Sequence, residues 1–149
     1  MPEKIYKSEE ALQSDIVRTF SELYPEKRGQ LFHVPNQRNH KLQAFKAKSI
    51  GIHAGVADLL FMQPNGIAEL ELSAIELKLP NSRHKIDHIE QQLEWAKTLQ
   101  RCGGFWRLCT NLEQAIAFIE CDTNKDYGLL ISDVEALIRA NKGKKTIKF

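Results

Sequence analysis

Two charged side chains interrupt an apolar segment of this chain, and they restrict its fold more than any other feature. The segment covers residues 75–79 (IELKL), in which Glu76 and Lys78 alternate with aliphatic residues. In a strand, residues two apart project from the same face, so these two charges would project together. A carboxylate and an ammonium group are costly to bury unless they pair or bind something. The segment therefore predicts either a buried ion pair or a binding site.

A second carboxylate, Asp58, ends the sequence GVAD at residues 55–58. Between it and the charged segment, a Pro-Asn-Gly sequence at 64–66 predicts a hairpin turn. If the two strands pair, Asp58 approaches Glu76 and Lys78. Two carboxylates beside a lysine suit a hard cation and an anionic substrate, and the alternative is a structural ion-pair cluster.

The other elements follow from helical spacing, strand-forming runs and turn residues. Apolar residues change parity within the second strand of the hairpin, which predicts a bulge or a break near Ser73. Residues 36–50 are polar and basic, and they predict a loop or a short exposed helix. The sequence predicts helices at 8–24, 86–101, 112–121 and 133–140, and strands at 31–34, 58–63, 67–79 and 105–109.

This order of elements predicts an α/β fold in which helices flank a mixed sheet. With 149 residues the chain has the length of a single domain, 1–149. We expect its core over about residues 8–120 and a basic C-terminal extension over 122–149.

Charge is unevenly distributed along the chain, although the net charge is only +2. Residues 27–57 contain no Asp or Glu, and we expect this stretch to bind phosphate. For a second basic cluster at the end of the chain, phosphate binding and a solvated tail are equally favoured. Its members are Lys142, Lys144, Lys145 and Lys148.

The cysteines and the apolar runs bear on the location of the protein. Three cysteines without a CxxC spacing predict reduced thiols in a cytosolic protein. The N-terminus lacks a signal-peptide pattern, and the apolar runs are too short to span a membrane. We therefore expect a cytoplasmic protein without a membrane partner, in a bacterial or phage-infected cell.

Four short motifs occur in order along the chain: E-x-x-x-Q at 9–13, GVAD at 55–58, ELK at 76–78, and Q-x-x-W at 92–95 followed by Gly103. In this order they resemble the VRR-NUC family of the PD-(D/E)XK nuclease superfamily. Asp with Glu-x-Lys alone would be a weak match, whereas four ordered motifs on the expected elements are specific.

The resemblance covers about residues 8–120 and implies a restriction-endonuclease-like αβββαβ core. It also implies a metal-dependent deoxyribonuclease that hydrolyses phosphodiester bonds. Ala57 stands where the family usually has proline. Because that proline is not a ligand, the difference leaves the implied chemistry in place.

Phosphodiester hydrolysis needs an activated water and compensation for the charge that develops on the phosphate. Mg²⁺ or Mn²⁺ supplies both, and these ions prefer carboxylate, carbonyl and water oxygens. We therefore assign Asp58 and Glu76 as metal ligands, and the resemblance adds the backbone carbonyl of Leu77. Lys78 would orient the attacking water or stabilise the phosphorus centre electrostatically.

The resemblance further implies catalytic roles for one residue on each of two helices. Glu9 would lie near the metal, directly or through a water, and Gln92 near the nucleophile or Lys78. Helical spacing places Glu9 on the inward stripe of the first helix, whereas Glu10 is rotated away from it. The alternative for Glu9 is a first-turn acid that faces the helix dipole, and for Gln92 a hydrogen bond to a strand edge. The choice between Glu9 and Glu10 stays open.

The basic stretch supplies the candidates for nucleic-acid binding. Asn36 follows Pro35, a pair common in the family, and would contact the phosphate backbone or brace the site. Phosphate contacts position a nucleic acid without reading its sequence. We therefore expect structure-selective cutting of four-way junctions, flaps or other branched DNA. The candidate residues are Asn36, Arg38, Lys41, Lys46 and Lys48.

Three other functions share parts of this pattern. A nicking or restriction-like nuclease on duplex DNA would use the same chemistry. A catalytically silent nucleic-acid-binding module is disfavoured by the complete Asp-Glu-Lys set, and a hydrolase of small phosphorylated molecules fits the long basic stretch less well. Small stand-alone members of the family look like homodimers, so the resemblance implies a homodimer that the sequence itself does not show.

Three further signals favour ordinary structural roles. His84 and His88 have a spacing that suits zinc on a helix, but no third ligand is evident, so a solvated helix start near DNA is favoured. Residues 122–126 resemble the start of a calcium loop, but Tyr127 occupies the position that needs glycine, which favours a polar turn. Trp106 is expected in the core.

Overall fold

The computed structural model describes residues 3–35, 46, 48–51, 53–64, 66–67 and 69–149. At its centre is a four-stranded sheet built from β1 (Leu31–His33), β2 (Leu59–Pro64), β3 (Leu70–Leu77) and β5 (Phe105–Cys109). Their spatial order is β1–β2–β3–β5. The first three strands pair antiparallel, and β5 runs parallel to β3, so the sheet is mixed.

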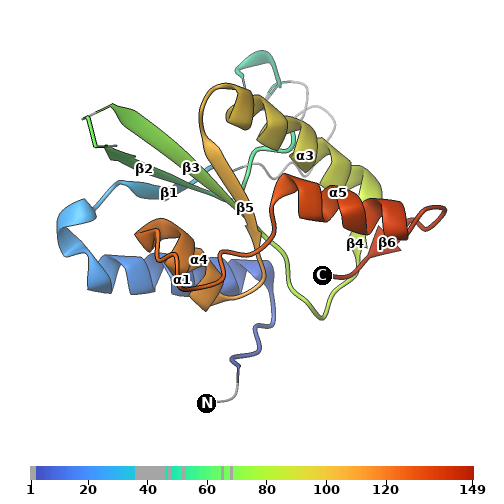
Figure 1. Cartoon of the computed structure of the whole chain (residues 1–149), viewed down its shortest axis with the longest axis horizontal. Coiled ribbons are helices and arrows are strands. Elements are labelled where there is room, and N and C mark those ends of the chain that lie inside the picture. Colours follow the sequence, from blue (N-terminus) through green and yellow to red (C-terminus); the bar gives the residue numbers. More distant parts are fainter. Residues whose placement is uncertain (1–2, 36–45, 47, 52, 65, 68) are drawn as a thin grey trace.

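Helices cover both faces of this sheet, as Figure 1 shows. On one face, α1 (Glu9–Leu23) and α4 (Leu112–Glu120) enclose one buried apolar cluster. On the other face, α3 (Ile86–Arg101) and α5 (Ile131–Ala140) enclose a second. A short 3-10 helix, η1 (Pro25–Lys27), follows α1. The predicted α/β class, with an αβββαβ core and helices on both faces of a mixed sheet, is confirmed.

Local signals explain where the first helix begins and how it is oriented. The Ser8 side chain accepts a hydrogen bond from the Ala11 amide at 3.1 Å and caps α1. The predicted apolar stripe is buried as far as Phe20. Leu23, which continues the helical spacing of Leu12, Ile16 and Phe20, is exposed in the last turn.

The predicted bulge near Ser73 is wrong, because β2 and β3 pair in a regular register along the whole length of β2. The change of parity has another cause. Residues 73–79 are all buried, since this end of the central strand is covered on both faces. Ile75 belongs to the cluster under α1, and Ala74 to the cluster under α3. Both parities therefore need apolar residues, and the alternation is lost without any irregularity of the backbone.

The C-terminal residues fold back onto the start of α3. There β6 (Thr146–Ile147) pairs antiparallel with β4 (His84–Lys85), the two residues that precede the helix. Ile147 is only 2% exposed and belongs to the cluster between α3 and α5. This small ladder was not predicted from the sequence. The four lysines of the C-terminal cluster are exposed around it.

Several smaller predictions meet the structure directly. Trp106 is buried in the cluster under α3, as expected for a core residue. Asp122 and Asp126 accept hydrogen bonds from backbone amides two residues further on, so this segment is a polar turn, as predicted. All three cysteines are free thiols, as predicted. None of the helices in the described ranges is long and apolar enough to cross a membrane.

Candidate active site

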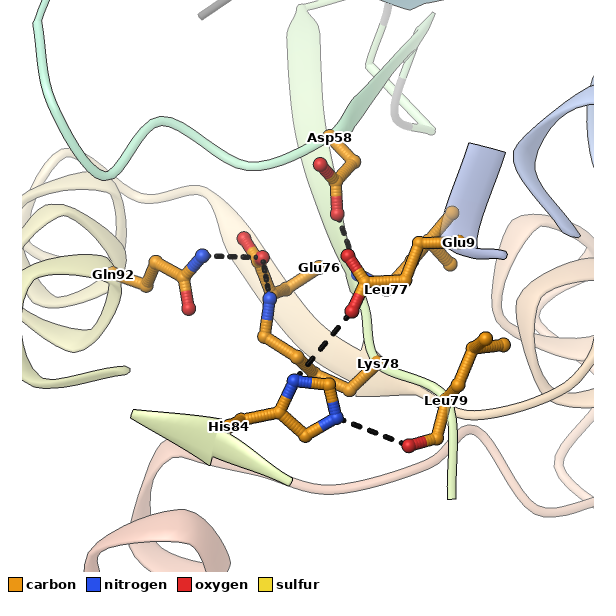
Figure 2. Close-up of polar contacts among 8 residues, drawn as sticks. All are labelled: Glu9, Asp58, Glu76, Leu77, Lys78, Leu79, His84 and Gln92. Carbon is orange, nitrogen blue, oxygen red and sulfur yellow. Dashed lines mark hydrogen bonds and ion pairs between the residues drawn. The ribbon is translucent and has the colours of Figure 1, made fainter. Parts of the chain in front are cut away.

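Asp58 and Glu76 lie side by side where β2 begins and β3 ends. Leu59 pairs with Ile75, so Asp58, which directly precedes β2, lies opposite Glu76 of β3. The Asp58 Oδ2 atom accepts a hydrogen bond from the Leu77 amide at 2.8 Å, as Figure 2 shows. The hairpin thus brings Asp58 next to the charged segment that contains Glu76 and Lys78, as predicted.

Glu76 is buried in this site, with only 1% of its surface exposed. Its Oε1 atom accepts hydrogen bonds from Lys78 Nζ at 2.8 Å and from Gln92 Nε2 at 2.7 Å (Figure 2). Among the described residues, neither Glu76 Oε2 nor Gln92 Oε1 has a hydrogen-bond partner, although both atoms are buried. A buried oxygen without a partner is costly, and in a native structure it often marks an ion or a water.

The charges of the site are incompletely compensated. Burial, reinforced by the nearby Asp58 carboxylate, raises the pKa of Glu76 from 4.5 to about 8, although Lys78 acts in the opposite direction. For Lys78, burial alone would lower the pKa, but Glu76 and Glu9 outweigh it and the pKa is raised. One lysine therefore faces several carboxylates. A divalent cation would supply the missing positive charge.

The geometry favours Glu9 over Glu10 as the acid of the first helix. Glu9 begins α1, and its Oε1 atom lies 3.6 Å from His84 Nδ1 (Figure 2). Its charge acts on both Glu76 and Lys78. Glu10 is exposed and also borders the hollow next to the site, but no hydrogen bond or ion pair joins it to Glu76, Lys78 or His84 among the described residues.

Asp58, Glu9 and Gln92 border a hollow of about 390 Å³, whereas Glu76 and Lys78 do not line it. Its walls come from the start of α1, the end of β1, the segment before β2, and α3. Among the residues that line it are Glu9, Glu10, His33, Asp58 and Gln92. A larger hollow of about 570 Å³ lies between α3 and α5, but none of the predicted catalytic residues lines it.

The oxygen donors of the site fit a hydrated divalent cation. Asp58, the unpartnered Glu76 Oε2 atom and the Leu77 carbonyl are donors of the kind that Mg²⁺ and Mn²⁺ prefer. No group of three His, Cys, Asp or Glu side chains in the described ranges is arranged to hold a metal ion. Mg²⁺ is commonly held by one or two carboxylates and several waters. The role of Glu9 toward a metal, directly or through a water, stays a prediction.

Gly55 fixes the GVAD segment against the helix that carries Gln92. Its φ is +86°, and a Cβ atom there would lie 2.5 Å from the Gln91 carbonyl oxygen. Only glycine allows both this conformation and this close approach. The contact holds Asp58 and Gln92 on opposite sides of one hollow.

Two histidines in the site were not predicted as site residues. His33 Nδ1 donates a hydrogen bond to the Asp58 carbonyl oxygen at 2.7 Å, and His33 also lines the hollow. His84 contacts Glu9, and its side chain is only 12% exposed, so the interpretation as a solvated helix start is wrong for this residue. His88 is exposed, as that interpretation requires. The His33 position in an acid-free stretch was the one available signal for that residue.

The predicted nucleic-acid contacts are only partly covered by the structure. Asn36, Arg38 and Lys41 lie outside the described residues. Lys46 and Lys48 have exposed side chains on a short helical stretch between β1 and β2.

Comparison with known protein families, with curated proteins and with solved structures found no match to this chain. The fold and the site geometry are therefore the basis for a functional proposal.

Proposed function

We propose that this chain is a metal-dependent DNA endonuclease that hydrolyses phosphodiester bonds in branched DNA. The observation that carries the proposal is the buried Glu76 carboxylate, which lies beside Asp58 and Lys78 and has one oxygen without a partner among the residues that the structure describes. A purely structural ion-pair cluster is stable when all its polar atoms are satisfied. An oxygen left without a partner fits a ligand set better than a structural cluster.

Each residue has a role that its contacts support. Asp58, Glu76 and the Leu77 carbonyl would hold Mg²⁺ or Mn²⁺, and Glu9 would act through a water. When bound, the cation supplies Lewis-acid stabilisation of the charge that develops on the phosphate. Lys78 is held toward Glu76 at 2.8 Å, where its ammonium group stabilises negative charge or orients the attacking water.

Gln92 completes the set from the opposite wall of the hollow. Its Nε2 atom donates to Glu76 Oε1 and fixes the orientation of that carboxylate. Its Oε1 atom, which has no partner among the described residues, is an acceptor for a water. Gln92 is thus suited to orient the nucleophilic water.

The charges around the hollow support a phosphate polymer as substrate only when a cation is present. The hollow is bordered by Glu9, Glu10 and Asp58, which would repel phosphate. Exposed Lys46 and Lys48 lie in the acid-free stretch and would contact the backbone outside the hollow. A homodimer rests on the family resemblance alone. The preference for branched DNA rests on the resemblance and on the expectation that phosphate contacts do not read sequence. A cytoplasmic location in a bacterial or phage-infected cell stays an expectation from the sequence.

The test is a panel of substrates that share one sequence: a four-way junction, a 5′ flap and a linear duplex. Each is incubated with the purified chain in Mg²⁺, in Mn²⁺ and in EDTA. We expect cleavage of the branched substrates with either metal and none in EDTA. Equal cutting of the linear duplex would favour the restriction-like alternative. Binding without cleavage in Mn²⁺ would favour the silent module and contradict the proposal.

A further inference from the structure

The β4–β6 ladder and the residues around it carry a dense group of positive charges. Residues 81–86 and 141–149 contain no Asp or Glu. Their lysine and arginine side chains are all exposed, and in the described part of the chain none of them forms an ion pair. Because the whole chain has a net charge of only +2, the remainder of the chain is net negative. We call this group the ladder cations: Arg83, Lys85, Lys142, Lys144, Lys145 and Lys148.

The two strands of the ladder separate packed residues from cations. His84 pairs with Ile147, which is only 2% exposed. Arg83 and Lys85 flank His84 in the sequence, and Lys148 follows Ile147. Since side chains alternate between the two faces of a strand, these three cations project away from the packed face. One face of the ladder is thus anchored to the fold, and the other presents positive charge to solvent.

Contacts with the rest of the fold hold the ladder beside the start of α3 (Figure 1). The Ile86 amide donates to the Lys145 carbonyl oxygen at 3.0 Å. The ring of Phe149 lies against the His84 ring with a centroid distance of 5.6 Å, and it packs against the buried cluster under α3. The basic end of the chain is therefore a folded element rather than a solvated tail.

The ladder also lies next to the candidate active site. β4 follows Lys78 after a short turn, and His84 Nδ1 lies 3.6 Å from Glu9 Oε1, at the edge of the hollow (Figure 2). The carboxylates that border the hollow repel phosphate, so a nucleic-acid backbone needs positive charge beside it. The ladder cations supply that charge at the edge formed by Glu9.

Repulsion among the ladder cations is a second argument for an anionic partner. Like charges on paired strands destabilise a sheet, and a ladder of two residues on each strand is marginal by itself. The next acids along the chain, Asp87 and Glu90, line the larger hollow between α3 and α5. A polyanion that contacts several of the cations at once relieves the repulsion and releases counterions.

We propose that the β4–β6 ladder is a docking surface for the phosphate backbone of DNA, which it holds beside the hollow. This inference rests on the proposed function, because it names the surface that holds the substrate of the same site. Lysine is a flexible point charge that suits phosphate better than a base edge. Binding to the ladder therefore depends neither on the DNA sequence nor on a metal ion.

The test measures binding of a fluorescein-labelled four-way junction to the full chain by fluorescence anisotropy in EDTA. The variant Lys85→Gln/Lys148→Gln removes two charges from the exposed face of the ladder. We expect it to bind roughly 10-fold more weakly than the wild type at about 0.1 M salt. Each lost phosphate contact reduces the slope of log K against log salt by about 0.9, so the slope should become less steep by about 2.

A matched control separates the ladder from net charge. Arg101→Gln/Lys125→Gln also removes two exposed positive charges, one at the other end of α3 and one in the turn after α4. We expect this variant to keep the affinity and the salt slope of the wild type. Circular dichroism at the assay temperature confirms that both variants are folded.

Each outcome decides a different question. Wild-type affinity and salt slope in Lys85→Gln/Lys148→Gln would overturn this inference and leave the proposed function standing. An equal loss in the Arg101→Gln/Lys125→Gln control would also overturn it, because net charge would then account for the binding. A wild-type chain that binds the junction through the ladder but does not cleave it in Mn²⁺ would overturn the proposed nuclease and support the docking surface.

Discussion

Glu76 carries an electrostatic cost that the rest of the site relieves only in part. Burying a carboxylate costs several kcal/mol even after the protein relaxes. The hydrogen bonds from Lys78 and Gln92 both reach the same oxygen, Oε1, and the other oxygen has no partner among the described residues. Without a cation, a proton takes its place, which is the physical meaning of a pKa near 8.

This raised pKa predicts a pH dependence of stability. Between its ordinary pKa of 4.5 and about 8, the folded chain binds more protons at Glu76 than the unfolded chain does. Stability from this group is therefore fully present below 4.5 and is lost as the pH rises through 8. One pKa unit corresponds to about 1.4 kcal/mol, so the total effect is a few kcal/mol.

The measurement is urea unfolding in EDTA at pH 5 and pH 8.5, for the wild type and for Glu76→Gln. We expect the wild type to lose more stability than Glu76→Gln over this range, because glutamine does not titrate. Glu90→Gln, an exposed acid on α3, should behave like the wild type. The same loss in all three proteins would show that Glu76 does not carry the effect.

Residues of the site differ in how far the sequence predicts them. We predicted Asp58, Glu76 and Lys78 because the amino-acid sequence alone shows charged residues within apolar segments. The register of one hairpin then brings the three residues together. The position of His84 beside Glu9 was not predicted, because it depends on the pairing of β4 with a strand at the far end of the chain. Whether Glu9 or Glu10 enters the site depended on the packing of α1 against the sheet, which helical spacing alone leaves open.

Among the elements, α3 and the segment before β2 must approach each other closely for the site to form. Gly55 lies at the point of closest approach, where the Gln91 carbonyl group leaves no room for a Cβ atom. The Asp58 and Gln92 side chains lie at the two ends of this contact. Packing between a loop and a helix, rather than sheet pairing, thus sets the width of the hollow.

Gly55→Ala and Gly51→Ala form a matched pair that tests this contact. Both glycines have positive φ, +86° and +90°, so each alanine costs about 1–2 kcal/mol in backbone strain. A Cβ at Gly51 meets no atom of the described residues within 4 Å. We therefore expect Gly55→Ala to lose a further 1–3 kcal/mol or so from overpacking, and to bind Mn²⁺ more weakly. Chemical denaturation and calorimetry provide both values, and equal losses in the two variants would refute the close-packing account.

The elements also show which sequence patterns mislead. The boundaries of α3 and β5 were predicted from strong periodicity and glycine stops, and the structure confirms them. The bulge at Ser73 was predicted from lost alternation, but a strand covered on both faces loses alternation without a bulge. The β4–β6 ladder has two residues on each side, too few to give any period in the sequence.

At the scale of the whole molecule, two cores meet at the sheet, and the candidate site lies where the sheet ends between α1 and α3. The central strand passes from the apolar cores directly into Glu76 and Lys78. This arrangement places the charged groups at the end of a strand that is buried on both faces, next to the hollow that Asp58 and Gln92 line. A rigid support of this kind is what a catalytic site with strict geometry requires.

The central claim is that Asp58, Glu76 and Lys78 form a metal-dependent catalytic site. The most direct measurement is single-turnover cleavage of a four-way junction in Mn²⁺ by Asp58→Ala, Glu76→Ala and Lys78→Ala, with Glu90→Ala as a folded control. We predict that each of the three loses at least roughly 10²- to 10³-fold in rate while its circular dichroism is unchanged, and that Glu90→Ala cuts like the wild type. Cleavage at the wild-type rate by any of the three would contradict the claim.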